Sequence, residues 1–144
     1  MDYNTPMEKY VFGQFSPEHL EAIQEGISLF NEKKYWECHE ALEDLWLDHV
    51  GDSARYVYWS IIQVAASMFH TREGNLTGAW GMLFKAQDKL RKCEAMHVET
   101  QLLYDYLSWA EFKKLVFSIS KKTPIEGYKE LYNFKFKDPK NWRV

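Results

Sequence analysis

Apolar residues recur every three or four positions along most of the chain, which is the spacing of one face of an α-helix. Four of them mark the first such stretch: Leu20, Ile23, Ile27 and Phe30. The stretch begins at Ser16-Pro17-Glu18, where serine can cap free helix amides and proline fits the first helical position. The pattern predicts a helix over residues 16–30, preceded by an N-terminal arm at residues 1–15.

Two further helices are predicted at residues 35–48 and 54–71, joined by the turn Gly51-Asp52-Ser53. The first of them carries a single apolar stripe, formed by Cys38, Ala41, Leu42 and Leu45. The second is apolar on nearly all sides, so we expect it to be the most buried helix of the protein. Because the turn is short, we expect the two helices to pack antiparallel.

The rest of the chain continues the helical pattern. A fourth helix follows the turn Gly74-Asn75, where asparagine can act as an N-cap, and runs to about residue 92. A fifth is predicted at residues 99–118, and a short sixth begins at Thr123. No stretch shows the pattern of a sheet strand. We therefore predict an all-α fold, a compact bundle of five to six helices built from antiparallel helix-turn-helix pairs.

The length of 144 residues fits one domain, with the bundle at residues 16–120 and a short helix and tail at residues 121–144. Hydrophobic residues at 46% and charged residues at 27% are typical of a folded globule. The two cysteines lie far apart and read as free thiols of a reducing compartment. No signal-peptide pattern is visible and no apolar run could span a bilayer, so we expect a cytoplasmic protein without a membrane partner.

Charge is distributed unevenly along the chain. Residues 1–50 contain eleven acidic and three basic residues, whereas residues 113–144 contain nine basic and three acidic ones. Basic residues interleaved with aromatic ones can bind single-stranded nucleic acid, but no nucleic-acid-binding motif is present and we do not expect that partner. We expect the basic tail to lie across the acidic half of its own molecule or of a partner subunit.

Polar residues at helical spacing provide the candidate chemistry, since residues three, four and seven apart share a face. In the helix at residues 35–48 these are His39, Glu43 and Trp46, with Glu40 beside them. In the next helix, which is otherwise apolar, they are Gln63, Ser67 and His70. If the two stripes meet, they form a cluster of His39, Glu40, Glu43, Gln63 and His70.

A buried polar group without a partner costs roughly 1–3 kcal/mol, so such a cluster needs an explanation. One is a hydrogen-bond network that fixes how the helices pack. A second is a metal site for zinc, manganese or iron, with His39, Glu43 and His70 as ligands. A third is a small-molecule pocket in which Glu40 or His39 acts as acid or base, with walls formed by Trp36, Trp46 and Trp59.

Several blocks of sequence resemble a known family. They are Tyr35-Trp36-Glu37-Cys38-His39-Glu40-Ala41-Leu42-Glu43-Asp44-Leu45-Trp46, Ile61-Ile62-Gln63-Val64-Ala65-Ala66, His70, and Gly74-Asn75-Leu76-Thr77-Gly78-Ala79. Over about residues 20–92 the chain is similar to a prokaryotic family known as domain of unknown function three hundred and nine. The resemblance implies a compact all-α bundle, but no activity.

The resemblance also implies which residues occupy signature positions. These are Glu37, His39, Glu40, Glu43, Trp46, Gln63, His70 and Asn75. The chain departs from the family pattern at Trp59-Ser60, where a Gln-Gly pair is usual. Because tryptophan is much larger than the usual residue, we expect Trp59 to fill part of any pocket.

Two functions are compatible with these features. The first is a binding or interaction module, whose partner is a small molecule or a protein, with the His/Glu/Gln cluster between the second and third predicted helices. The alternative is a small hydrolase- or lyase-type enzyme, metal-dependent or not, that uses His39, Glu40 and His70. The sequence identifies no cofactor. Its many Trp and Tyr residues are compatible with a homodimer.

Overall fold

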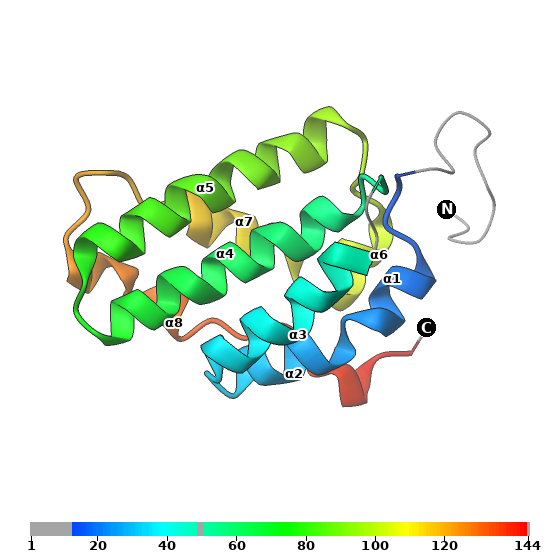
Figure 1. Ribbon diagram of the computed structural model, residues 1–144, viewed down its shortest axis with the longest axis horizontal. Coiled ribbons are helices and arrows are strands. Elements are labelled where there is room, and N and C mark those ends of the chain that lie inside the picture. Colours follow the sequence, from blue (N-terminus) through cyan, green and yellow to red (C-terminus); the bar gives the residue numbers. More distant parts are fainter. Residues whose placement is uncertain (1–12, 49–50, 144) are drawn as a thin grey trace.

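A computed structural model describes residues 13–48 and 51–143 of the protein. Within these ranges all regular structure is helical and no strand is present (Figure 1). This confirms the predicted all-α class. The predicted N-terminal arm lies outside the described residues, except for residues 13–15.

The described residues form eight α-helices and two short 3-10 helices. The α-helices are α1 (Pro17–Ala22), α2 (Gln24–Asn31), α3 (Tyr35–Asp48), α4 (Arg55–Arg72), α5 (Leu76–Ala95), α6 (Gln101–Tyr106), α7 (Trp109–Phe117) and α8 (Lys129–Tyr132), and the 3-10 helices are η1 (Ile125–Tyr128) and η2 (Pro139–Asn141). The number exceeds the predicted five to six, mainly because two helices predicted as continuous are interrupted.

The interruptions lie at Ile23 and at Ser108. The chain bends at Ile23, which separates α1 from α2. Ser108 adopts a left-handed backbone with φ of +50°, which ends α6 and starts α7. Its neighbours Leu107 and Trp109 are both fully buried. In a continuous helix side chains two positions apart point about 200° apart, so the break allows both to enter the core.

Helix α4 lies between α3 and α5 in one layer (Figure 1). Trp46 near the end of α3 contacts Trp59 near the start of α4, with ring centroids 4.8 Å apart. The hydroxyl of Ser67 in α4 donates to the carbonyl of Ala79 in α5, at 2.7 Å. Late residues of one helix therefore meet early residues of the next, as the predicted antiparallel pairs require.

The core is centred on α4, as its all-round apolar pattern predicted. Ten of its 18 residues are buried, against three of 14 in α3. The fully buried side chains of α4 include Val57, Ile61, Val64 and Met68. A central helix of this kind leaves few positions for polar residues, so each polar side chain on α4 needs a partner or a function.

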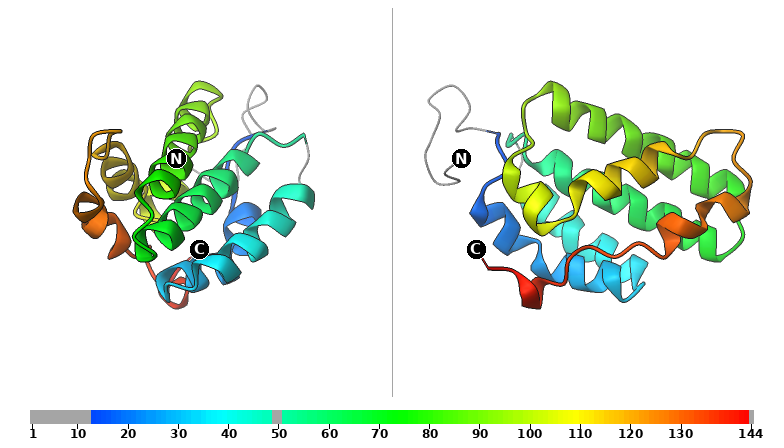
Figure 2. Two further views of the ribbon diagram at one scale, coloured as in Figure 1. Left: turned by 60° about the vertical axis from the view of Figure 1, so that its left-hand side comes forward. Right: turned by 180° about the vertical axis from the view of Figure 1, so that it is seen from behind.

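The C-terminal segment runs behind the molecule and across α2 (Figure 2). The side-chain amide of Asn31 exchanges two hydrogen bonds with the backbone of Phe136, at 2.8 and 2.9 Å. The rings of Phe30 and Phe136 lie 4.9 Å apart. Among the described residues no ion pair joins this tail to an acidic residue of the N-terminal half. The tail thus lies on its own N-terminal half, held by aromatic packing and backbone bonds rather than by charge.

Candidate functional site

The contact between α3 and α4 places the predicted polar residues of α3. Trp36 contacts Phe69 and Trp46 contacts Trp59, with ring centroids 6.5 and 4.8 Å apart. In an antiparallel pair with these end points, His39 lies alongside the middle of α4. Trp59 also receives the ammonium of Lys89 from α5, 4.3 Å above its ring. This face of α4 therefore borders both neighbouring helices.

We call five side chains along this contact the α3–α4 stripe: His39, Glu43, Trp46, Trp59 and Gln63. On α3 the three residues span seven positions, or about 10 Å, and on α4 the two residues lie one helical turn apart. Three of them carry a buried polar atom that has no hydrogen-bond partner within the described part of the chain.

The first of these atoms is Nδ1 of His39. The other ring nitrogen, Nε2, lies 3.2 Å from the Glu43 carboxylate one turn further along α3. The ring of Trp36 stacks almost parallel on the imidazole, with centroids 5.3 Å apart. A neutral imidazole that donates from Nε2 to a carboxylate keeps a lone pair on Nδ1. His39 therefore presents an unused hydrogen-bond acceptor.

The other two atoms are Nε1 of Trp46 and Oε1 of Gln63. An indole nitrogen can only donate, and an amide oxygen can only accept. The Trp46 ring is engaged by the guanidinium of Arg55, 4.8 Å from its centroid, but its N–H is not. Gln63 is only 6% exposed and makes no hydrogen bond with the described residues. Each unpaired atom costs roughly 1–3 kcal/mol of folding free energy.

Two other predicted residues meet where α4 leads into α5: His70 lies in the last turn of α4, and Asn75 directly precedes α5. Asn75 is the N-cap, because its Oδ1 accepts from the amide of Gly78 at 3.0 Å. Its Nδ2 lies 3.3 Å from Nδ1 of His70. A side chain at position 78 would place its Cβ 2.7 Å from the His70 ring, so glycine permits this packing. The N-cap prediction is confirmed, and the imidazole of His70 is explained by contacts with α5.

Glu37 and Glu40 lie on the solvent side of α3. Neither forms an ion pair or a hydrogen bond with the described residues. Trp36 and Leu47, 57% and 52% exposed, lie on the same outward face. On an ideal helix Trp36, Glu40, Glu43 and Leu47 fall within about 60° of one another. This face of α3 therefore presents two apolar side chains with carboxylates between them.

The predicted metal ligands are thus divided between two places. His39 and Glu43 pair on α3, whereas His70 packs against the start of α5. Within residues 13–48 and 51–143, no group of three His, Cys, Asp or Glu side chains could hold a metal ion. The predicted catalytic set of His39, Glu40 and His70 is divided in the same way, since Glu40 points to solvent.

The physical reason for the position of His70 is its place along α4, because it lies in the last turn, beside the N-cap of α5. Ser67 and His70 belong to the same polar stripe as Gln63, but both bond or pack against α5. The spacing of residues showed which side chains share a face of α4. It did not show that this face borders α5 as well as α3. Gln63 alone of these three polar residues makes no hydrogen bond or ring contact among the described residues.

Comparison with known proteins supplies a family for this region. Residues 23–82 match the model of the family described as Domain of unknown function (DUF309). This segment is similar to the DUF309 family. It extends from the start of α2 into α5 and contains the whole α3–α4 stripe. The family resemblance is therefore confirmed. No curated protein and no solved structure matches the chain.

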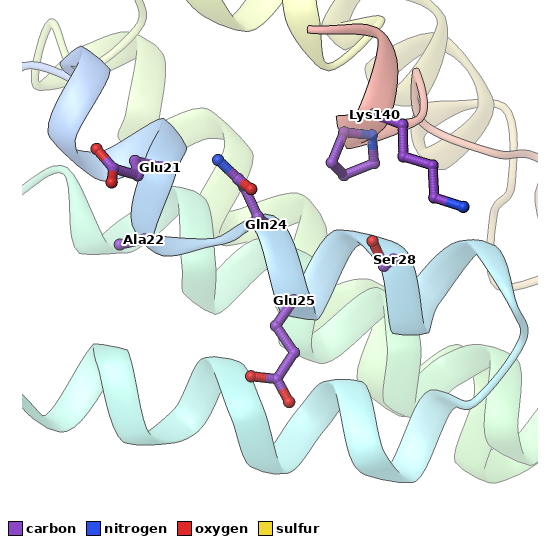
Figure 3. A pocket seen from close by; sticks show the side chains of 7 residues that line it. Glu21, Ala22, Gln24, Glu25, Ser28 and Lys140 are labelled. Carbon is purple, nitrogen blue, oxygen red and sulfur yellow. The ribbon is translucent and has the colours of Figure 1, made fainter.

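A shallow surface pocket lies where α1 and α2 meet the C-terminal segment (Figure 3). It is lined by Glu21, Ala22, Gln24, Glu25, Ser28, Pro139 and Lys140. All of its charged side chains are exposed. None of the predicted site residues lines it. The pocket has no buried polar group that would orient a ligand, so it does not compete with the α3–α4 stripe as a site.

Both cysteines of the chain are buried, Cys38 in the segment similar to the DUF309 family and Cys93 outside it. Burial raises the pKa of the Cys38 thiol to about 12. Burial also raises the pKa of Cys93 well above its usual range. Thiols in this state are protonated and poor nucleophiles. Cys38 is therefore a core residue, although it lies next to His39 in sequence.

One pairing was not predicted. Nε2 of His19 in α1 lies 2.8 Å from the Asp52 carboxylate in the turn before α4. The two residues are far apart in sequence, and neither belongs to a spaced motif, so no local signal indicated the contact. It connects the start of α1 to the turn between α3 and α4.

No helix of the described residues is both long enough and apolar enough to cross a membrane.

Proposed function

We propose that this protein is a binding module and that the α3–α4 stripe, with the outward face of α3, forms its binding surface. The main support is the set of three buried polar atoms without partners: Nδ1 of His39, Nε1 of Trp46 and Oε1 of Gln63. A protein interior normally pairs such atoms, and each exception calls for an explanation. A bound partner that supplies the missing bonds is that explanation.

A purely structural network does not explain these atoms. Such a network stabilises helix packing only when its members bond to one another. Among the described residues the stripe contains one internal polar contact, between His39 and Glu43. Gln63 and the Trp46 indole contribute no hydrogen bond to packing, so stability alone gives no reason for a glutamine at position 63.

The geometry favours binding over catalysis. A general base must lie within hydrogen-bond reach of the proton it removes. Glu40 is exposed and His70 packs beside the N-cap of α5, and neither forms a hydrogen bond or ion pair with His39 among the described residues. The side chain of His39 is 28% exposed, and Trp46 is also partly exposed. Rotation of these two side chains would give a partner access to the three atoms.

Affinity enrichment with matched variants tests the proposal. Wild-type protein, Gln63→Leu and Trp36→Ala would be immobilised in parallel with Phe84→Ala, a control on α5. Phe84 is 58% exposed, which matches the 57% of Trp36. We expect a partner, identified by mass spectrometry, that wild type and Phe84→Ala retain and the other two variants lose. Retention by all four proteins, or loss with Phe84→Ala as well, would contradict the proposal.

A further inference from the structure

We infer that the partner of this surface is a protein segment that presents arginine or lysine side chains next to apolar ones. The inference rests on the proposed function, because it names the partner of the same site. Three independent features of α3 and its contact with α4 support it: the charge of the outward face, the kind of hydrogen-bonding atoms left unused, and the exposed aromatic ring.

The charge of α3 has a single sign. Within residues 37–44 the helix carries Glu37, Glu40, Glu43 and Asp44, and α3 contains no lysine or arginine. Of these four acids, only Glu43 has a side-chain partner among the described residues, the His39 imidazole at 3.2 Å. A face of this kind attracts cationic partners and repels phosphate groups. The charge therefore favours a basic protein segment over a nucleic acid.

The unused polar atoms point to the same chemistry. Two of the three, Oε1 of Gln63 and the lone pair on Nδ1 of His39, are acceptors. Gln63 is more than nine-tenths buried, and its amide oxygen has no hydrogen-bond partner among the described residues. Arginine and lysine carry only donors, five and three N–H groups respectively. A cationic side chain would therefore match both acceptors as well as the carboxylates.

The aromatic rings are suited to cations. The ring of Trp36 is more than half exposed at one end of the acidic face. Along the same contact, the guanidinium of Arg55 covers the Trp46 ring and the ammonium of Lys89 covers the Trp59 ring. Tryptophan is the most favourable aromatic residue for such contacts. Trp36 can accept a cation from a partner in the same way.

The extent of the surface indicates a segment rather than a small amine. Trp36 and Leu47 are eleven positions apart, which corresponds to about 16 Å along a helix. The acidic residues lie between these two apolar ends. A partner that contacts both ends and the carboxylates between them needs apolar side chains flanking basic ones. A short amphipathic helix or an extended basic peptide satisfies this requirement.

Fluorescence anisotropy with two labelled peptides tests the inference. The first is a helical peptide in which arginine and leucine share one face, and the second has glutamate in place of each arginine. We expect the arginine peptide to bind and the glutamate peptide not to bind. The double variant Glu40→Gln/Glu43→Gln should weaken binding by roughly 3- to 10-fold, and added salt should weaken it further.

The control variant is Glu111→Gln/Glu126→Gln, which removes the same charge from two exposed acids of α7 and η1. It should bind within about twofold of wild type, because only charges close to the peptide contribute at ordinary salt. An equal loss in both double variants, or binding of the glutamate peptide, would overturn the inference. So would self-association in sedimentation experiments that the α3 variant abolishes, since it would assign the surface to a second copy of the chain.

The test separates this inference from the proposed function. A partner whose binding requires Trp36 and Gln63 but is unchanged in Glu40→Gln/Glu43→Gln would sustain the binding module and refute the cationic partner. Proton NMR adds a local readout, because the indole N–H of Trp46 has no hydrogen-bond partner in the free protein. We expect its resonance to shift when the arginine peptide binds. An unchanged resonance would locate the peptide elsewhere and overturn the inference.

Discussion

The protein buries two glutamines in neighbouring helices, and their surroundings differ. Gln87 in α5 is 5% exposed, and its Nε2 donates to the carbonyls of Val116 and Ile119 at 3.0 and 2.9 Å. Gln63 in α4 is 6% exposed and bonds to none of the described residues. Gln87 satisfies backbone carbonyls at and beyond the end of α7, so its role is structural. Gln63 has no such role, which is why we assign it to binding.

The same difference separates the two contacts of α4. Toward α5, Ser67 donates to the Ala79 carbonyl and Asn75 caps the helix beside His70. Toward α3, Trp46 leaves its indole N–H unused. The polar groups at the contact with α5 are therefore paired within the chain. Those at the contact with α3 are not all paired, and we propose that an external partner pairs them.

The largest expected effect concerns alkaline pH, and it tests whether both contacts exclude water. Cys38 lies in α3 and Cys93 in α5, and burial raises both thiol pKa values, that of Cys38 to about 12. In the unfolded chain a thiol ionises near pH 8.5. The unfolded state therefore loses its protons first as pH rises, and the free energy of unfolding decreases above that pH.

We expect the loss to reach several kcal/mol by about pH 11 for the two thiols together, at 1.4 kcal/mol per pKa unit. Urea unfolding at a series of pH values measures it. Cys38→Ala and Cys93→Ala should each reduce, by similar amounts, the slope with which the free energy of unfolding falls as pH rises. A slope that depends on Cys93 alone would show that water reaches the contact between α3 and α4, and the three polar atoms would then be hydrated rather than unpaired.

The next effect is the loss of the structural glutamine. Gln87→Leu removes two hydrogen bonds and leaves the carbonyls of Val116 and Ile119 without that partner. We expect a loss of about 2–3 kcal/mol in the free energy of unfolding, measured by urea denaturation. Because the segment after α7 is anchored there, amides near Ile119 should also exchange faster with solvent. A loss below about 0.5 kcal/mol would remove the basis of the comparison between the two glutamines.

A smaller effect is expected for the cap of α5. Asn75→Ala removes the acceptor for the Gly78 amide and should cost about 1 kcal/mol. Asn75→Asp keeps an oxygen at the cap but loses the contact of Nδ2 with His70, so it should cost less. Thermal denaturation of both variants measures the difference. Equal losses would mean that the contact with His70, rather than the cap, is what position 75 contributes.

The helix positions were largely readable from sequence, because they depend on local patterns. The helix expected at residues 54–71 is α4 (Arg55–Arg72), and the cap at Asn75 lies where its residue type indicated. The break at Ser108 was not readable, since no glycine or proline marks it and its cause is the burial of Leu107 and Trp109.

The candidate site was only partly readable, for a related reason. Helical spacing identified His39, Glu43, Trp46 and Gln63 as residues that share faces of α3 and α4. It could not show which neighbouring helix each position meets, and Ser67 and His70 meet α5. It also could not show that polar atoms of the remaining residues are buried without a hydrogen-bond partner. That property depends on distances between helices, which no local pattern records.

The most direct test of the account is the stability of Gln63→Leu beside that of Gln87→Leu. Leucine has nearly the volume of glutamine and removes the buried amide oxygen that has no partner. We expect Gln63→Leu to be as stable as wild type or up to about 1 kcal/mol more stable, and to have lost partner binding. A loss of 2 kcal/mol or more, similar to that of Gln87→Leu, would show that Gln63 supports the fold, and the central claim would be wrong.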